Sequence, residues 1–270
     1  MTDTIDYYAN PADVPQGTLV ELFFRTVDQF AEKAAYNVTG RNARTYTYGQ
    51  VLGVARRGAG ALAASGLGRG DRAAILSENR AEWALADWSC LCAGVVDVPI
   101  YSTLPAAQVA YIIEDSGASL IFVSDAEQLE KAREAVARLD REVEIVVFEA
   151  LAATDGAVSW DDFLARADDA DAADFEARAR QAAPEDVATM IYTSGTTGTP
   201  KGVMLTHNNV ASNVWASEQL LGVGPDDVSL SFLPLSHVLQ RMVDYLFFAR
   251  GCMVTHGAIE TVAADMKTLR

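Results

Sequence analysis

Four short apolar segments recur along the first half of the chain, roughly 22 to 25 residues apart: 73–76, 95–100, 119–123 and 144–148. Apolar runs of this length, bounded by turn residues, are typical of buried strands. The intervening stretches carry helical patterns. Strands and helices that alternate in this rhythm predict βαβ units around a parallel sheet, and so an α/β fold.

The helical stretches have recognisable starts. Residues 79–82, Asn-Arg-Ala-Glu, have the form of a capping box, which predicts a helix through Trp83 and Trp88. Pro105 fits the first turn of a second helix. Residues 126–139 are alanine-rich and amphipathic, which predicts a third helix.

The chain changes character at residues 150–184, which are rich in Ala and Asp. We interpret residues 151–185 as an acidic surface connection between a first βα subdomain at 18–150 and a second at 186–270. In the second, Thr206 is expected to cap a helix. Its predicted strands are 187–192, 203–205, 228–233 and 252–255, and its predicted helices are 207–221, 236–250 and 259–270.

Composition narrows the class of protein. The formal net charge is −16, and 18 acidic but only 7 basic residues lie between Asp125 and Asp186. This balance argues against nucleic-acid binding and is typical of a solvated helical surface. The three cysteines contain no C-x-x-C pair, so a disulfide framework or zinc site is not expected. An acidic start and no long apolar run predict a cytoplasmic protein without a signal peptide or membrane span.

The segment that carries most chemistry follows the strand predicted at 187–192. It reads Thr-Ser-Gly-Thr-Thr-Gly-Thr-Pro-Lys from Thr193 to Lys201. Glycines let a ligand approach the backbone, hydroxyls and amides donate hydrogen bonds to phosphate, and a lysine adds a compact cation. Pro200 and Gly202 flank Lys201, so the spacing is not that of a Walker A loop. The alternative, a flexible Ser/Thr/Gly linker, does not usually follow a buried strand directly.

The segment from Met190 to Lys201 resembles the phosphate-binding signature of the adenylate-forming superfamily. Residues 231–241, Ser-Phe-Leu-Pro-Leu-Ser-His-Val-Leu-Gln-Arg, resemble a segment of long-chain fatty acyl-CoA synthetases, although Leu239 and Gln240 stand where Phe and Glu are usual. Residues 77–83, 98–101 and 107–113 are similar to the same group. The resemblance covers about residues 18–270 and implies the parallel-sheet subdomains of that family's N-terminal domain, incomplete at the C-terminus.

The resemblance also implies site residues. Those expected to bind ATP phosphates are Thr193, Ser194, Gly195, Thr196, Thr197, Gly198 and Lys201, and Thr196 is also a candidate Mg²⁺ ligand. His237 is expected beside the carboxylate and the adenylate, the alternative being a histidine that caps a helix. Trp215, His237 and Met242 are candidates for an acyl pocket, with core packing as the more common explanation for such apolar residues. His207 is interpreted as a cap, and His256 has no assigned role.

The implied activity is two-step activation of a fatty acid with ATP, Mg²⁺ and CoA. The Tyr-Gly-x-Thr-Glu and Thr-Gly-Asp segments of the family, and its C-terminal lysine, are not found and would lie beyond Arg270, so this chain alone is not expected to turn over. A longer chain would supply them. The alternatives are a ligase for another carboxylic acid and a non-catalytic nucleotide- or lipid-binding remnant. At most peripheral membrane contact is expected.

Overall fold

Seven strands form the larger of two sheets in the computed structural model, which describes residues 16–38, 44–152, 154, 156–167, 174–194 and 199–269. Every neighbouring pair in it is parallel except β8–β9. The four recurring apolar segments are β3 to β6, which confirms their prediction. In sheet order the strands are β7 (Val158–Ser159), β6 (Glu144–Val147), β5 (Leu120–Val123), β3 (Arg72–Leu76), β4 (Val96–Ile100), β8 (Val187–Ser194) and β9 (Pro200–Thr206).

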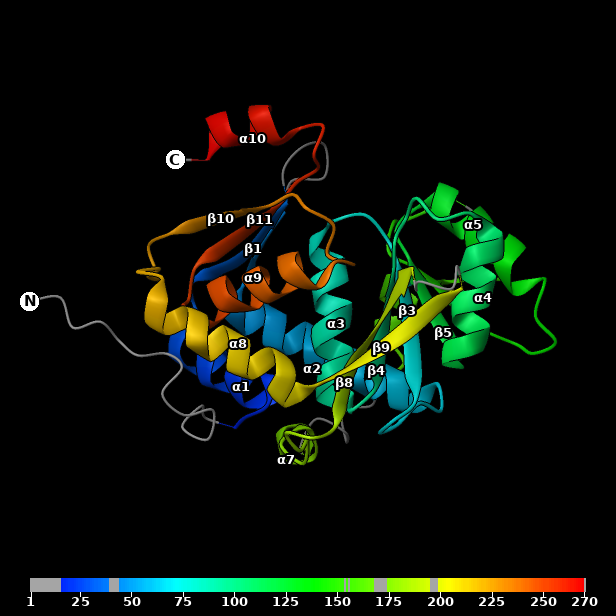
Figure 1. Cartoon of the computed structure of the whole chain (residues 1–270), viewed down its shortest axis with the longest axis horizontal. Helices are drawn as coiled ribbons and strands as arrows, with labels where there is room; N and C mark the ends of the chain where they lie inside the picture. Colours follow the sequence, from blue (N-terminus) through cyan, green and yellow to red (C-terminus); the bar gives the residue numbers. More distant parts are fainter. Residues whose placement is uncertain are drawn as a thin grey trace, which may run out of the picture.

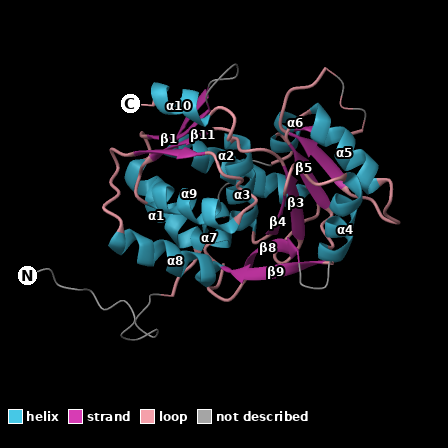
Figure 2. Ribbon diagram, turned by 45° about the horizontal axis from the view of Figure 1, so that its top comes forward, coloured by secondary structure: helices cyan, strands magenta, loops and turns pink. Residues whose placement is uncertain are grey.

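Helices cover both faces of this sheet (Figure 2). Alternate residues of a strand point to opposite faces, and in β3 Ala73 and Ile75 join one apolar cluster while Ala74 and Leu76 join another. Helices α4 (Ala106–Ser116) and α5 (Ala126–Val136) pack in the second cluster. The first cluster contains α2 (Tyr48–Ala64), α3 (Ala81–Ala93), α6 (Trp160–Leu164) and α7 (Phe175–Ala179).

The smaller sheet has the order β10-β11-β1-β2. Its strands are β1 (Ala34–Val38), β2 (Arg44–Thr47), β10 (Val228–Ser231) and β11 (Met253–His256). Helices α1 (Leu19–Phe30), α8 (His207–Leu220) and α9 (Val238–Ala249) pack beneath it, and α10 (Val262–Thr268) lies on the other side (Figure 1). Helix α3 stands between the two sheets, with Trp83 and Trp88 almost fully buried.

Each sheet combines strands from both of the sequence ranges proposed as subdomains. Strand β1, near the start of the chain, pairs in parallel with β11, near its end. Strand β8 pairs with β4 through Asp97 and Thr189. Within the acidic connection, β7 adds an edge strand to the larger sheet and α6 packs on that sheet. The division into sheets therefore does not follow the ranges 18–150, 151–185 and 186–270.

The predicted capping box at 79–82 is wrong. Arg80 is the N-cap of α3 and makes no side-chain cap hydrogen bond. The Asn79 side chain instead donates to the carbonyls of Ser231 and Leu233 and accepts from the amide of Leu235. The cap predicted at Thr206 is confirmed, since its hydroxyl accepts from the amide of Asn209 in a full capping box.

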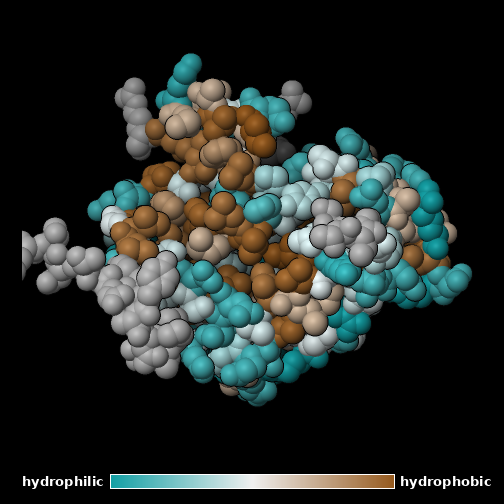
Figure 3. Space-filling view, viewed as in Figure 1, coloured by the Kyte–Doolittle hydropathy of each residue, from teal (hydrophilic) through white to brown (hydrophobic). Residues whose placement is uncertain are grey.

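Large apolar side chains remain exposed on one face of the molecule (Figure 3). Apolar surface gathered in this way is typical of a region that meets another protein segment or ligand. Among the described residues, the large apolar side chains that are more than half exposed include Met204 of β9, Leu239 of α9 and Met266 of α10. No helix in the described part of the chain is long and apolar enough to cross a membrane.

Candidate functional site

The hairpin of β8 and β9 positions two of the residues expected to bind phosphate. The strands are antiparallel, and Thr193 pairs with Lys201 while Ser194 pairs with Pro200. Residues directly opposite each other in such a pair point to the same face of the sheet. Both Thr193 and Lys201 are exposed. A hydroxyl donor and an ammonium group therefore lie on one accessible face, at the end of β8 and the start of β9.

The turn itself was the centre of the sequence prediction. Gly195, Thr196, Thr197 and Gly198 lie outside the described residues, and Ser194 is described only as the last backbone position of β8. Their expected contacts with phosphate, and the expected contact of Thr196 with Mg²⁺, stay predictions.

Two tyrosines anchor the hairpin to α4. The Tyr111 hydroxyl donates to the Pro200 carbonyl at 3.0 Å, and the Tyr192 hydroxyl donates to Asp115 Oδ2 at 2.6 Å. Their rings meet edge to face. Burial, together with the Asp115 carboxylate, raises the pKa of Tyr192 above its ordinary value, so its hydroxyl stays protonated and able to donate.

Gly202 is required by crowding within the hairpin. A Cβ at this position would lie 2.8 Å from Met190 Sδ and 2.9 Å from Met190 Cγ. The glycine next to Lys201 therefore leaves room for the Met190 side chain of β8 to lie against β9.

A cavity of about 230 Å³ adjoins this hairpin at the carboxyl ends of β4 and β8. Ligands of open parallel sheets bind at this edge. Its lining includes one expected phosphate-binding residue, Thr193, and is otherwise largely apolar: Pro99, Ile100, Tyr101, Leu104, Gln108, Ile112, Tyr192 and Pro200.

His237 begins α9 as its N-cap. Its Nδ1 accepts a hydrogen bond from the Leu239 amide at 3.2 Å, and its side chain is exposed. This contact confirms the capping alternative, and a capping ring can still present its other edge to a ligand. The segment before it is tied by Asn79 to the chain that follows the carboxyl end of β3. His237 therefore lies on a segment docked at the same edge of the larger sheet as the carboxyl end of β8.

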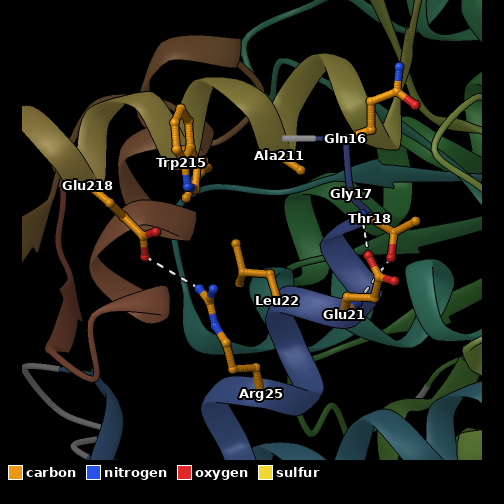
Figure 4. Close-up of a pocket in the computed structure, with 10 residues that line it drawn as sticks. Gln16, Gly17, Thr18, Glu21, Leu22, Arg25, Ala211, Trp215 and Glu218 are labelled. Atoms are coloured by element: carbon orange, nitrogen blue, oxygen red, sulfur yellow. Dashed lines mark hydrogen bonds and ion pairs between the residues drawn. The ribbon is translucent and has the colours of Figure 1, made fainter. Parts of the chain in front are cut away.

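The three residues expected to line an acyl pocket do not all line the groove that contains Trp215. Trp215 lines a groove of about 200 Å³ between α1 and α8, which the ion pair of Arg25 with Glu218 borders (Figure 4). His237 and Met242 are not among the groove residues. Met242 instead approaches Ser217 where α8 meets α9, with 4.0 Å between Sδ and Oγ.

One buried ionic cluster was not anticipated from the sequence. Arg241 of α9 is 3% exposed and binds the carboxylates of Asp87 and Asp97. It also donates to the Thr189 hydroxyl at 2.7 Å and to the Tyr245 hydroxyl at 2.9 Å. The only available signal was that charged residues sit inside otherwise apolar segments, such as Asp97 in Val-Asp-Val. The Tyr245 hydroxyl in turn donates to Asp87 at 2.6 Å.

The other two histidines, His207 and His256, are buried. His207, the first residue of α8, is 2% exposed, so it is buried beside the Thr206 cap and is not the cap itself. His256 ends β11, packs its ring against Tyr36 and lies 3.5 Å from Asp244. Among the described residues no group of three His, Cys, Asp or Glu side chains is placed to hold a metal ion.

Comparison with known proteins places this geometry in a family. The model of the AMP-binding enzyme family matches residues 23–269. Long-chain-fatty-acid–CoA ligase 1 of Homo sapiens is 32% identical over 208 residues, which are 73% of this chain and 30% of that protein. Fatty acyl-CoA synthetase A of Dictyostelium discoideum is 34% identical over 225 residues, which are 78% of this chain and 32% of that protein. The chain thus spans about a third of the length of these curated relatives.

Solved structures agree on the fold. A long-chain-fatty-acid–CoA ligase from Archaeoglobus fulgidus superposes with a TM-score of 0.78 at 19% identity, over 94% of this chain and 50% of that one. The N-terminal domain of FACL13 from Mycobacterium tuberculosis gives 0.68 at 25% identity, over 89% of this chain and 57% of that one. The α/β parallel-sheet architecture inferred from the sequence is confirmed. The chain belongs to the AMP-binding enzyme family.

Proposed function

We propose that this chain is the ATP-binding part of a ligase that activates a long-chain fatty acid, first to acyl-AMP and then to acyl-CoA. The observation that carries the proposal is the pairing of Thr193 with Lys201 on one exposed face of the β8–β9 hairpin. The names of the relatives supply the substrate class. Because the chain spans only about a third of those relatives, the activity of the whole protein is part of the proposal.

The chemistry requires activation because a carboxylate offers a thiol only oxide as its leaving group. In the first step a carboxylate oxygen attacks the α-phosphorus of ATP, and pyrophosphate leaves. In the second step the thiolate of CoA attacks the acyl carbon, and AMP leaves with the electrons of the broken C–O bond. Both steps depend on stabilising charge at phosphate and on alignment of the reacting atoms.

The described residues supply part of that environment. The Lys201 ammonium would neutralise charge on the β- and γ-phosphates, and the Thr193 hydroxyl would donate to a phosphate oxygen. Mg²⁺ would enter bound to ATP and lower the charge of its phosphates. The apolar cavity beside Thr193 would hold part of the substrates away from water. His237, at the start of α9, would lie near the carboxylate of the fatty acid.

A binding experiment tests the nucleotide site directly. Isothermal titration calorimetry of the 270-residue chain with Mg²⁺–ATP is expected to show binding. The substitution Lys201→Ala should weaken it by about 1.5–3 kcal/mol, the scale of a hydrogen bond to a charged group. The matched control is Lys267→Ala, which removes an exposed lysine of α10. Equal ATP affinity in the two variants would remove Lys201 from the site.

A second assay tests the substrate. Fatty-acid-dependent exchange of labelled pyrophosphate into ATP is expected only from a form that also carries the Tyr-Gly-x-Thr-Glu and Thr-Gly-Asp segments of the family, and not from the 270 residues by themselves, because those segments supply further contacts. Long-chain acids should support more exchange than medium-chain or aryl acids. The reverse order would favour a ligase for another carboxylic acid. ATP binding with no exchange in any form would favour a non-catalytic nucleotide-binding protein. A cytoplasmic location, with at most peripheral membrane contact, is also part of the proposal.

A further inference from the structure

The buried cluster around Arg241 joins four elements that are far apart in the sequence. Arg241 lies one turn into α9, Asp87 in α3, Asp97 in β4 and Thr189 in β8. Arg241 Nη1 donates to Asp97 Oδ1 at 2.8 Å and to Thr189 Oγ1 at 2.7 Å, while Nη2 binds both carboxylates. One guanidinium thus ties α9 to two strands of the larger sheet, β4 and β8, and to α3, which packs on that sheet.

The cluster is fully enclosed. Asp97 is 0% exposed, Asp87 and Thr189 are 2% exposed, and the face of the guanidinium lies over the Trp83 ring. The hydroxyls of Thr189 and Tyr245 donate to Asp97 and Asp87, so the carboxylates have partners besides Arg241. A guanidinium holds several partners in a fixed plane, whereas a lysine at the same place would act as a point charge.

Burying this many charges is not an efficient way to stabilise a fold, since desolvation offsets most of the attraction. Burial raises the pKa of Asp87 to about 7, although the Arg241 guanidinium opposes the shift. An apolar cluster of similar volume would serve packing at least as well. What the ionic cluster adds is directional: it sets the relative position of β8 and α9 to within hydrogen-bond geometry.

Those two elements carry the candidate site. Strand β8 leads from Thr189 of the cluster to Thr193, four residues further on, which is expected to bind phosphate. Helix α9 begins at Val238, and its N-cap His237 lies four residues before Arg241. We propose that Arg241 is a positioning residue for adenylation, which aligns the carboxylate side of the site at the start of α9 with the phosphate side at the end of β8. The inference rests on the proposed function and adds a determinant inside the core, away from the substrates.

The test compares local alignment with global stability. Arg241→Lys keeps the positive charge but loses the planar fork, and Asp87→Asn keeps the shape but removes one charge. Arg250→Lys makes the same change at the exposed C-cap of α9. Leu129→Ala removes a buried side chain of α5, far from the cluster in sequence and in the other apolar cluster, as a control for destabilisation. Each variant is assayed by amide hydrogen exchange, urea unfolding and Mg²⁺–ATP titration of the 270-residue chain.

In Arg241→Lys, exchange should rise in residues 187–193 and 237–241 beyond the rise that its loss of global stability predicts. The ATP affinity should fall on the order of tenfold, as expected when groups that act together lose alignment. Asp87→Asn should raise exchange in the same segments to a smaller extent. It replaces Arg241→Lys as the test variant if Arg241→Lys does not fold. Arg250→Lys and Leu129→Ala should leave the ATP affinity unchanged.

A uniform rise in exchange, or an ATP affinity in Arg241→Lys equal to that of Leu129→Ala at matched stability, would overturn the proposal and leave Arg241 as a packing residue. If the unmodified chain binds no ATP, the proposed function fails. The exchange measurement then still decides whether Arg241 couples α9 to β8.

Discussion

At the scale of single residues, the surroundings of His207 predict how the stability of the fold depends on pH. Burial lowers its pKa to about 4, against 6.5 for an unperturbed histidine, and the nearby Asp186 only partly opposes the shift. Below pH 6.5 the unfolded chain gains a proton that the folded chain does not bind, so this histidine contributes stability above pH 6.5 that is lost as pH falls towards 4. His207→Gln should therefore flatten the decline in unfolding free energy between pH 6.5 and 4, by up to roughly 3 kcal/mol. Urea unfolding at several pH values measures it.

The control for this prediction is His237→Gln, which replaces an exposed histidine at another helix start. Asp87 titrates in the same range with the opposite sign, because a raised carboxyl pKa makes the folded state less stable as pH rises from 4 to 7. The comparison must therefore be the difference between each variant and the unmodified chain. A parallel decline in His207→Gln would mean that the buried imidazole takes up a proton without unfolding.

At the scale of elements, Asn79 acts on a segment distant in sequence and not on the helix beside it. Asn79→Ala removes three hydrogen bonds to residues 231–235 and none to the start of α3. We expect amide exchange to rise in residues 232–237 while residues 81–85 stay as protected as before, with a stability loss of about 1–3 kcal/mol. Hydrogen exchange read by mass spectrometry resolves the two segments. Faster exchange confined to residues 81–85 would instead indicate that Asn79 caps α3, as the capping box predicted.

Sequence patterns predicted the strands with enough apolar residues but not the contacts between distant parts of the chain. The apolar residues located strands β3 to β6, β8, β10 and β11, and the cap at Thr206 is local chemistry. Strands β1 and β2 were not located, since Asn37 interrupts the apolar residues of β1 and Tyr46 is the one apolar residue of β2. The pairing of Thr193 with Lys201 follows once β8 and β9 are taken as a hairpin. The Arg241 cluster could not be predicted, because its partners lie 52 to 154 residues away and only the fold brings them together.

At the scale of the whole molecule, the two sheets make the start and the end of the chain depend on each other. The smaller sheet places β1 between β2 and β11, and Trp88 of α3 packs against Phe248 and Tyr245 of α9. Strand β8 likewise needs β4 as its parallel neighbour, and Arg241 needs Asp87 and Asp97. We therefore expect a fragment of residues 186–270 to lack a cooperative unfolding transition by itself, because its strands and its buried arginine have lost their partners.

A fragment of residues 1–185 keeps β3 to β7 and their helices, so it should retain secondary structure while Trp88 becomes exposed. Mixing the two fragments should shift the tryptophan emission back to shorter wavelength and restore one unfolding transition in circular dichroism. The shift should be absent when the added fragment carries Phe248→Ala, since that ring lies 4.9 Å from Trp88 and is fully buried. Cooperative unfolding of residues 186–270 alone would show that this range is an independent subdomain, as interpreted from the sequence. It would also show that the range folds without its strand partners from the first part of the chain.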